Sequence, residues 1–375
     1  GLRAVRRQDE ATVANLAARF VLWPSDGGLE LEPLAGSKAA NLAELARLGA
    51  AVDVPPWFVV TDRALREALS APAPSRPGTP WSHGDESWSM AEAIAASVAR
   101  TDADAEQKAS IIQQLWADFT MPGAVRDAVV DAYRRLGPEG EPFVAIRSSA
   151  REEDTRAAAR AGEFDTFLFV RGEHALVDHL RRAWSGLWTG RAIAERAACG
   201  RDGLGEGGGI LVQRIVDARV SGVLQTINVA ERRTRELVIS AGLGLGEGVV
   251  SGAVSADHVV VSKDEDPDTE PLRFRYVTAD KRERVVFDER RGAGTVRADV
   301  LSHQRLRPAL EYVALVELVR TATRLEKAYG YPLDLEFGIE GATVWLLQVR
   351  PVPGSRTAWR DAVARRRRSR RTAPG

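Results

Sequence analysis

The sequence predicts an α+β fold arranged in two lobes. At 375 residues the chain exceeds the roughly 250–300 residues at which single hydrophobic cores stop growing. The first half carries apolar residues mainly at helical spacing, and the second half is rich in β-branched runs. A glycine-rich polar stretch, Cys199 to Gly209, separates the halves and is typical of a linker. We therefore place the lobes at residues 1–200 and 201–353, followed by a basic tail at 354–375.

The composition argues against several classes of protein. Hydrophobic residues make up 44% of the chain and charged residues 28%, which is ordinary for a soluble globular protein. Lysine plus arginine and aspartate plus glutamate both number 52, so no net field favours nucleic acid or a membrane as a partner. The arginine-rich tail has no apolar period. We therefore expect it to be disordered, and its deletion (residues 356–375) to leave the melting temperature nearly unchanged.

The sequence also bears on the compartment. Cys199 is the single cysteine, so an internal disulfide is excluded, and this fits a reducing cytoplasm. No window approaches the roughly 18–20 uninterrupted apolar residues of a membrane span. The N-terminus carries charges where a signal peptide needs an apolar core. We expect a cytoplasmic protein.

The elements of the first half follow from periodicity and from glycine and proline breaks. Thr61 is an N-cap candidate because it follows a short apolar run and precedes a helical pattern. The polar stretch Ala71–Glu86 has no period and is predicted to be a loop. Helices are predicted at Ala39–Leu48 (ending at Gly49), over most of Ala91–Leu136 and at Ala175–Arg196, and strands at Trp57–Val60, Phe143–Ile146 and Phe167–Val170.

In the second half, β-branched runs bounded by glycine, aspartate or arginine predict strands. A helical pattern ends at Gly330, and two apolar runs around Gly341 then form a hairpin. The predicted elements are strands at Ile210–Val216, Gly222–Val229, Glu236–Ala241 and Asp257–Val261, a helix at Leu310–Gly330, and hairpin strands at Leu333–Ile339 and Thr343–Val349.

This hairpin is the most informative piece of the sequence. Strand alternation puts Asp334 and Glu336 on one face of the first strand, and Gln348 and Arg350 on one face of the return strand. A three-residue loop, Gly341–Thr343, would place Glu336 opposite Gln348, and Asp334 opposite Arg350. The same alternation places the side chains of Trp345, Leu347 and Val349 together on the opposite, apolar face.

The polar face of the hairpin has two interpretations. A carboxylate beside an amide oxygen is a pair of hard ligands suited to magnesium that carries phosphates, and an arginine nearby can grip a phosphate bidentately. Alternatively, the face is solvated and Asp334 simply pairs with Arg350.

A second cluster follows the predicted strand at Phe143–Ile146. Arg147, Ser148 and Ser149 come first, and Ala161–Thr166 (AGEFDT) follows as a flexible glycine loop. A strand that opens into a guanidinium, hydroxyls and backbone amides is a way to bind an anion. Two serines after a strand are, however, more usually part of a cap or a turn.

Two glycine motifs complete the set. Gly36-Ser37-Lys38 stands at the start of a helix, where anions are favoured, although it is not a Walker A motif and Lys38 also fits a solvated first turn. Gly242–Gly252 contains G-x-G-x-G but lacks the acidic residue about 20 positions on that a Rossmann unit needs. For it we expect a close backbone approach to a ligand or to another strand. The five histidines show no metal-ligand spacing.

Taken in order, these motifs resemble the N-terminal ATP-binding domain of the phosphoenolpyruvate synthase and pyruvate phosphate dikinase family, which also opens rifampicin phosphotransferase. The resemblance covers nearly the whole sequence, and the collinear order of its motifs makes it specific. It rests on GSKAANLAEL, VPPWFVVT, AIRSSAREED, AGEFDTFLFV, LVQRIVDARVSGVLQT, LVISAGLGLGEGVVSGAVSADHVVV and YGYPLDLEFGIEGATVWLLQVRPV.

The resemblance implies a two-lobed ATP-grasp fold with the nucleotide between the lobes, and ATP with magnesium as cofactors. It assigns Glu336 and Gln348 to the metal, and Arg147 and Arg350 to catalysis. The nucleotide- and phosphate-binding residues that it implies are Lys38, Arg147, Gly162, Thr166, Gln213, Glu336, Gln348 and Arg350.

The resemblance further implies a phosphotransferase. In the family, ATP phosphorylates a histidine on a separate swivelling domain, so the expected partner is a phosphohistidine domain that receives a phosphoryl or pyrophosphoryl group. Ser82-His83 and Ser302-His303 lack the glycine context of that domain. Two other functions stay open: direct phosphorylation of a small molecule, and a catalytically weak ATP-sensing role. Pyruvate, water, an antibiotic and a glucan all remain open as final acceptor.

Four departures from the family pattern suggest an outlying branch. Gln225 stands where an aromatic residue is common, and Val229 replaces the proline of the usual turn. Arg151 and Arg160 stand where the family has a small and a bulky apolar residue, respectively. None of the four is among the carried-over contacts.

Overall fold

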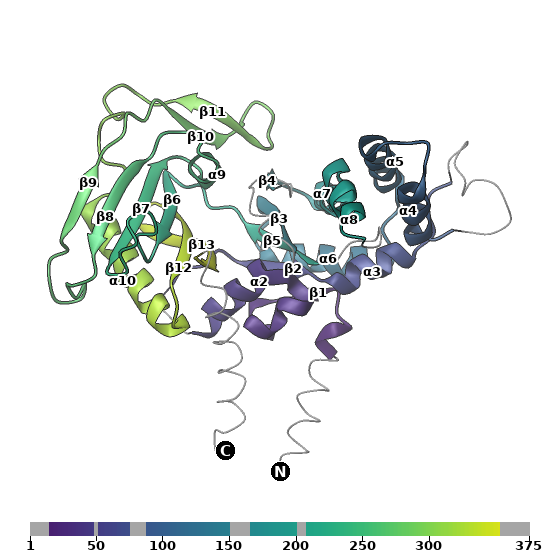
Figure 1. The fold of residues 1–375 in the computed structure, drawn as a ribbon, viewed down its shortest axis with the longest axis horizontal. Helices are drawn as coiled ribbons and strands as arrows, with labels where there is room; N and C mark the ends of the chain where they lie inside the picture. Colours follow the sequence, from purple (N-terminus) through teal and green to yellow (C-terminus); the bar gives the residue numbers. More distant parts are fainter. Residues whose placement is uncertain (1–14, 49–51, 76–87, 151–165, 201–207, 353–375) are drawn as a thin grey trace, which may run out of the picture. The chain divides into compact units, whose positions relative to one another are not determined.

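The computed structural model describes residues 15–48, 52–75, 88–150, 166–200 and 208–352. The chain divides into two compact units (Figure 1). Unit 1 comprises Gly1–Asp26, Leu31–Ala40 and Pro56–Arg214, and unit 2 comprises Gly27–Glu30, Asn41–Pro55 and Ile215–Gly375. The secondary structure mixes helices and sheets in both units, as the α+β prediction requires.

Unit 1 is built on a five-stranded antiparallel sheet with the order β1-β2-β5-β3-β4. Its strands are β1 (Val21–Leu22), β2 (Trp57–Val60), β3 (Val144–Ala150), β4 (Phe167–Val170) and β5 (Gly208–Arg214). Its helices are α3 (Asp62–Ser70), α4 (Met90–Ala99), α5 (Ala105–Asp118), α6 (Gly123–Leu136), α7 (Glu173–Ser185), α8 (Gly190–Ala198) and the 3₁₀ turns η1 (Pro24–Asp26) and η5 (Gly186–Trp188).

One face of this sheet forms the core of unit 1. Residues paired across strands share a face, and the row Phe58, Val212 and Ile146 is fully buried. This face and the helices form one apolar cluster, in which Trp116 and Trp184 lie with their ring centroids 5.6 Å apart. The opposite face carries Gln213 and Arg147 together with the apolar residues Trp57 and Leu211.

Helix α2 (Glu32–Arg47) has a kink at Gly36, where φ is +78°. The 3₁₀ turn η2 (Leu29–Leu31) precedes it, and the division between the units falls inside it, after Ala40. Two other helices begin with reciprocal capping boxes, Ser89 with Glu92 in α4 and Asp104 with Gln107 in α5.

Unit 2 contains a six-stranded antiparallel sheet with the order β13-β12-β6-β7-β8-β9 and a separate two-stranded sheet of β10 and β11. The strands are β6 (Val220–Gln225), β7 (Glu236–Leu243), β8 (Asp257–Ser262), β9 (Phe274–Val277), β10 (Glu283–Phe287), β11 (Thr295–Asp299), β12 (Leu333–Glu340) and β13 (Thr343–Pro351). The helices are α9 (Gly246–Val250) and α10 (Tyr312–Tyr329).

The large sheet of unit 2 buries one face and leaves the other partly exposed. Leu335, Leu224 and Ile239 form a buried row, and α10 packs on β12 and β13 (Figure 1). Alternate residues, Glu336 and Gln225 among them, lie on the half-exposed face. The helix ends at Gly330 in the left-handed conformation, as its sequence predicts.

Several predicted elements are confirmed, and others differ. The strand at Trp57–Val60 has the predicted bounds, and Thr61 is the N-cap of α3, although its hydroxyl donates to Arg19 O instead of capping. The predicted helix at Ala175–Arg196 is broken by η5 into α7 and α8. Most of the predicted loop at Ala71–Glu86 lies outside the described residues, as do Gly49 and the tail from 354 onward.

The division of the chain differs from the predicted lobes at 1–200 and 201–353. Strand β5 belongs to unit 1 because it pairs with β2 and β3. Asn41–Pro55 belongs to unit 2, where Asn41 O accepts a hydrogen bond from the Tyr329 hydroxyl at 3.1 Å. The sequence also predicted no strand at β9, β10 or β11, which are short, contain charged residues and have few fully buried positions.

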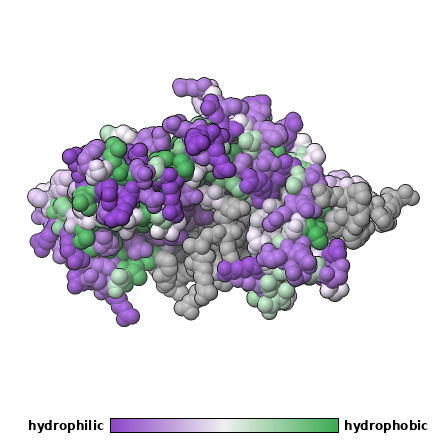
Figure 2. Space-filling view, turned by 90° about the horizontal axis from the view of Figure 1, so that it is seen from above, coloured by the Kyte–Doolittle hydropathy of each residue, from purple (hydrophilic) through white to green (hydrophobic). Residues whose placement is uncertain are grey.

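Hydrophilic residues predominate on the face of the molecule in Figure 2, and apolar residues appear there in small groups. Within the described ranges, no helix is long and apolar enough to cross a membrane.

Candidate functional site

The β12–β13 hairpin has the predicted register at its polar end. Glu336 lies opposite Gln348, and Asp334 lies opposite Arg350. Glu336 is half-buried, Gln348 is buried with 4% of its surface exposed, and Arg350 is exposed. The four polar side chains therefore share one face of the sheet, as strand alternation predicts.

The predicted three-residue loop of this hairpin is wrong. Glu340 pairs with Thr343, so the turn consists of two residues, Gly341 and Ala342. Leu347 is the extra residue of a β-bulge opposite the Glu336–Phe337 step. The shorter turn and the bulge cancel, which is why the register at Glu336 is still the predicted one.

The bulge changes the face of the residues between it and the turn. Leu346 pairs with Phe337 and is buried, so it lies on the apolar face with Val349. Trp345 pairs with Gly338 and lies on the other face. The prediction that Trp345 and Leu347 share the face of Val349 is therefore wrong, because one inserted residue reverses the alternation.

Asp334 and Arg350 form an ion pair in which one carboxylate oxygen takes both donors. The Arg350 Nε lies 2.9 Å and its Nη2 2.8 Å from Asp334 Oδ2. The Asp334 side chain is only 6% exposed, and its Oδ1 is buried without a hydrogen-bond partner in the described part of the chain. Burial raises the pKa of the Asp334 carboxyl, and the charge and hydrogen bond of Arg350 partly offset that rise.

Glu336 and Gln348 are suited to a magnesium ion. Magnesium prefers oxygen ligands and is usually held by one or two carboxylates together with substrate phosphates. Among the residues that the structure describes, no group of three or more histidine, cysteine or acidic side chains could hold a metal by itself. A carboxylate and an amide oxygen therefore fit an ion whose other ligands come from phosphate and water.

The sequence did not single out Gln225 for this face. Gln225 is directly opposite Asp334, and Val223 is directly opposite Glu336, both across the β6–β12 pairing. The parity of β6 alone could not place Gln225 beside Asp334, because more than 100 residues separate β6 from β12 in the chain.

In unit 1, Arg147 and Gln213 lie on one face of the sheet. Ala145 pairs with Gln213 and Arg147 with Leu211, so the two polar residues are on neighbouring strands, one step apart along β3. The sequence predicted that Arg147, Ser148 and Ser149 follow the strand. Instead they lie inside β3, because the backbone of β5 continues the pairing as far as Gly208.

The structure brings the Gly36–Lys38 motif against this end of β3. Lys38 Nζ donates to Ser148 O at 3.0 Å, and the backbone N–H of Ala39 donates to Ser149 Oγ at 3.2 Å. A Cβ at Gly36 would meet Ser149 O at 1.4 Å, so only glycine permits this contact. Two motifs that are more than 100 residues apart thus form one cluster.

The remaining residues of unit 1 that were predicted to bind the nucleotide are Gln213, Thr166 and Gly162. Gln213 is buried, and its Nε2 has no hydrogen-bond partner among the described residues. Thr166 is exposed and directly precedes Phe167, which pairs with Ile146 next to Arg147. Gly162 lies outside the described residues.

The glycine-rich segment Gly242–Gly252 approaches another strand closely, which is one of the two outcomes that we expected. Gly244 has φ +85°, and a Cβ there would meet Val285 O of β10 at 2.3 Å. The N–H of Leu245 donates to the same carbonyl at 2.9 Å, and Ser221 Oγ donates to Gly244 O at 2.7 Å. The glycines therefore allow the turn after β7 to pack on β10.

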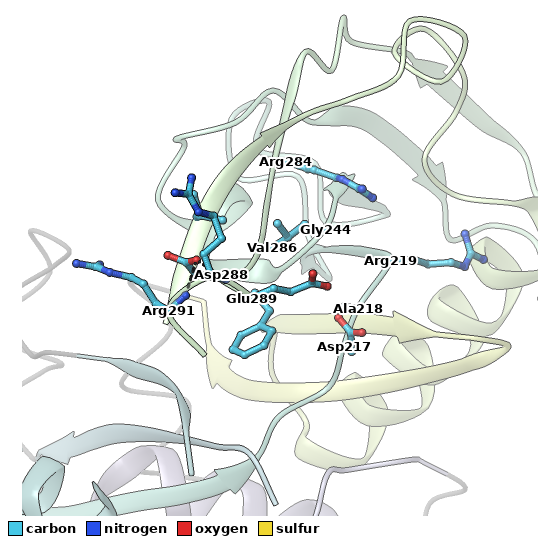
Figure 3. A pocket seen from close by; sticks show the side chains of 12 residues that line it. Asp217, Ala218, Arg219, Gly244, Arg284, Val286, Asp288, Glu289 and Arg291 are labelled. Atoms are coloured by element: carbon cyan, nitrogen blue, oxygen red, sulfur yellow. Dashed lines mark hydrogen bonds between the residues drawn. The ribbon is translucent and has the colours of Figure 1, made fainter. Parts of the chain in front are cut away.

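A cavity of about 910 Å³ lies beside this turn in unit 2 (Figure 3). Its lining includes Ala218, Gly244 and Val286. The charged residues that line it are Asp217, Arg219, Arg284, Asp288, Glu289, Arg290 and Arg291. Because both signs of charge are mixed around it, the cavity has no clear preference for an anion over a cation.

One known protein family matches most of this chain. The pyruvate phosphate dikinase, AMP/ATP-binding domain family matches residues 32–371. The chain belongs to this family. The match includes every residue that the sequence singled out for the site, from Gly36 to Arg350, and it extends into the segment after residue 353.

Curated relatives of this AMP/ATP-binding domain family member include a phosphoenolpyruvate synthase and a rifampicin phosphotransferase. Phosphoenolpyruvate synthase of Aeropyrum pernix is 33% identical over 362 residues, which cover 89% of this chain and 42% of that protein. Rifampicin phosphotransferase of a Streptomyces species is 32% identical over 324 residues, which cover 84% of this chain and 34% of that protein. The chain therefore spans less than half the length of these relatives.

Among solved structures, a dinucleotide-forming acetyl-coenzyme A synthetase of Ca. Korarchaeum cryptofilum is 12% identical and covers 60% of this chain and 81% of its own, with a TM-score of 0.32.

Proposed function

We propose that the chain is a dikinase-type ATP-binding phosphotransferase module. It binds Mg-ATP and transfers a phosphoryl or pyrophosphoryl group to a histidine on a separate domain or protein. Membership of the AMP/ATP-binding domain family supports the nucleotide, and the names of the relatives support the transfer. The observation that carries the proposal is the register that sets Glu336 opposite Gln348, beside the Asp334–Arg350 pair.

The polar face of the hairpin supplies the groups that phosphoryl transfer requires. Phosphoryl transfer depends mainly on positioning and on stabilising negative charge. Glu336 and Gln348 would hold magnesium, which neutralises charge on the phosphate oxygens when it is bound. Arg350 would stabilise the charge of the transferred group. Its Nε and Nη2 contact Asp334, and this ion pair orients the guanidinium.

In unit 1 the proposed ligand groups lie along β3, with Gln213 opposite Ala145 and Lys38 bonded to Ser148. Lys38 and Arg147 supply positive charge for phosphates, and Gln213 supplies a buried amide for the nucleotide. Thr166 completes the described set, and Gly162 stays a proposal from the resemblance alone. We propose an ATP-grasp fold from the same resemblance, with Mg-ATP as the ligand.

The decisive test is transfer to a histidine domain taken from a phosphoenolpyruvate synthase relative. Glu336→Gln removes a ligand charge at constant volume, so metal-dependent transfer should fall by orders of magnitude while the fold survives. Arg350→Lys should be poorly tolerated, because an ammonium cannot reproduce a planar bidentate grip. Glu289→Gln, an exposed carboxylate of the same unit, is the matched control and should change nothing. Equal activity of Glu336→Gln and Glu289→Gln would contradict the proposal.

The same assay separates the other two functions. Turnover of ATP with a small molecule but without the histidine domain would indicate a kinase that acts directly. Binding of ATP without turnover under any condition would indicate an ATP sensor.

A second experiment concerns the cluster in unit 1. Lys38→Ala and Arg147→Ala should each lower the affinity for ATP at least tenfold more than the affinity for adenosine, as measured by calorimetry. The reason is that the two side chains are proposed to contact phosphates. Lys38 also donates to Ser148 O, so a purely structural role is the alternative. Equal losses for ATP and adenosine would support that alternative.

A further inference from the structure

Gln225 occupies a defined position next to the Asp334–Arg350 pair. The register of unit 2 places Val238, Gln225, Asp334 and Arg350 in one row across β7, β6, β12 and β13. Residues directly opposite each other in an antiparallel sheet have Cβ atoms about 4.5–5.5 Å apart, and their side chains contact each other. Asp334 therefore has a charged neighbour on one side, Arg350, and an amide on the other, Gln225.

The two sides of the Asp334 carboxylate are not equally satisfied. The Arg350 Nε and Nη2 both contact Oδ2, at 2.9 and 2.8 Å. Oδ1 is buried and has no hydrogen-bond partner in the described part of unit 2. A buried carboxylate oxygen without a donor is unfavourable, so a nearby donor that turns toward it stabilises the ionised, paired form.

Gln225 is placed to be that donor. Gln225 is half-buried, and its side chain forms no hydrogen bond within the described ranges. Its opposite neighbour on β7 is Val238, which offers no polar group, so Asp334 is its polar neighbour in the row. A glutamine amide has two N–H donors and three rotatable bonds to direct them.

We propose that Gln225 is a positioning residue for Arg350. When its side chain rotates toward Asp334, the carboxamide donates to Oδ1, which has no partner in the described part of the chain, and this added hydrogen bond fixes the carboxylate in the orientation in which Oδ2 holds the Arg350 guanidinium. The effect passes through Asp334, so Gln225 needs no contact with the nucleotide. Its consequence for phosphate transfer rests on the proposed function, but the positioning itself does not.

The positioning is tested in the nucleotide-free protein by ¹⁵N NMR of the Arg350 Nε–H group, which donates to Asp334. Gln225→Met keeps the volume and removes the donor. It should speed exchange of this proton about tenfold and shift its signal, while the melting temperature stays within a few degrees. Gln225→Glu sets a carboxylate opposite Asp334 and should have a larger effect, because like charges directly opposite repel.

Two control variants test whether the effect is specific to the amide of Gln225. Gln304→Met changes an exposed glutamine of the same unit and should leave the Arg350 signal as it is. Gln225→Asn shortens the amide by one methylene and should restore part of the protection. Exchange in Gln225→Met equal to that in the unaltered protein would overturn the proposal, whatever the activity.

A second measurement links the positioning to the site. The Gln225→Met substitution should weaken Mg-ATP binding or phosphate transfer when it is the only change in the protein. It should have little further effect when Arg350→Lys is already present. Independent, additive losses would show that Gln225 acts on something other than Arg350. Suppose that Gln225→Met loses the protection of the Arg350 Nε–H group but that the unaltered protein does not bind ATP. This result would support the positioning role of Gln225 and refute the proposed function.

Discussion

At the scale of single residues, Asp257 is the most heavily bonded carboxylate described in unit 2. Its two oxygens accept from Lys281 Nζ at 2.5 Å, from the Tyr276 hydroxyl at 2.8 Å, and from the N–H groups of Ala279 and Ala309 at 2.8 and 2.7 Å. Both charged side chains are fully buried. The network therefore ties β8 to the segments on either side of β10 and β11.

Removing one partner of the buried Lys281–Asp257 ion pair should strongly destabilise the fold. Lys281→Met leaves the Asp257 charge buried and unpaired, and breaking a buried pair in this way costs about 3–5 kcal/mol of the free energy of unfolding. Urea denaturation measures the loss. Arg282→Met, at an exposed neighbouring residue, should cost no more than about 1 kcal/mol. Similar losses for the two variants would mean that the pair is not buried in solution.

Asp280 gives a prediction that depends on pH. Hydrogen bonds from Arg305 and then Arg282 lower the pKa of its carboxyl to about 2. Because the folded pKa is below the unfolded value, the stabilisation is present above pH 4 and is lost as the pH falls toward 2. In a ¹³C NMR titration, Arg305→Met should raise this pKa toward the ordinary value of 3.8. An unchanged midpoint would show that the arginine is not the cause.

At the scale of elements, the turn between β7 and α9 depends on glycine for two separate reasons. Gly244 needs a positive φ and also has no room for a Cβ, which would meet Val285 O at 2.3 Å. Gly252 has a similar φ of +70°, but no atom lies within 4 Å of the position of its Cβ. The two glycines therefore separate backbone strain from steric clash within one motif.

The pair of variants Gly244→Ala and Gly252→Ala measures both effects. Gly252→Ala should lower the free energy of unfolding by about 1–2 kcal/mol, the cost of a left-handed backbone for a residue with a Cβ. Gly244→Ala should cost clearly more, because β10 must also move away. Thermal or urea unfolding gives both values. Equal costs would mean that β10 does not contact this turn in solution.

At the scale of the whole molecule, ligand binding should appear as stability. A ligand at 100 times its dissociation constant adds about 2.7 kcal/mol to the free energy of unfolding. Mg-ATP should therefore raise the melting temperature by several degrees, and ATP with a chelator should raise it less. Glu336→Gln should reduce the difference that magnesium makes. No change at millimolar Mg-ATP would contradict nucleotide binding itself.

The sequence by itself determined the features that depend on alternation along a single strand. Asp334 and Glu336 share a face because successive side chains of a strand point to opposite sides. Their pairing with Arg350 and Gln348 was predicted from a three-residue loop, and it holds because the bulge offsets the shorter turn that the structure has. The bulge at Leu347 shows the limit of this reasoning, since the inserted residue left the register at Glu336 as predicted but reversed the face of Trp345.

Only the tertiary structure decided which distant segments are neighbours. Gln225 lies beside Asp334, Gly36 lies against Ser149, and β5 pairs with β2 and β3. Each of these contacts joins residues dozens to more than 100 positions apart. Nothing local specifies them, because closing long loops costs free energy that only the packing of the complete core recovers. The sequence therefore determined the chemistry available on each strand, and the packing of the sheets determined which of those groups meet.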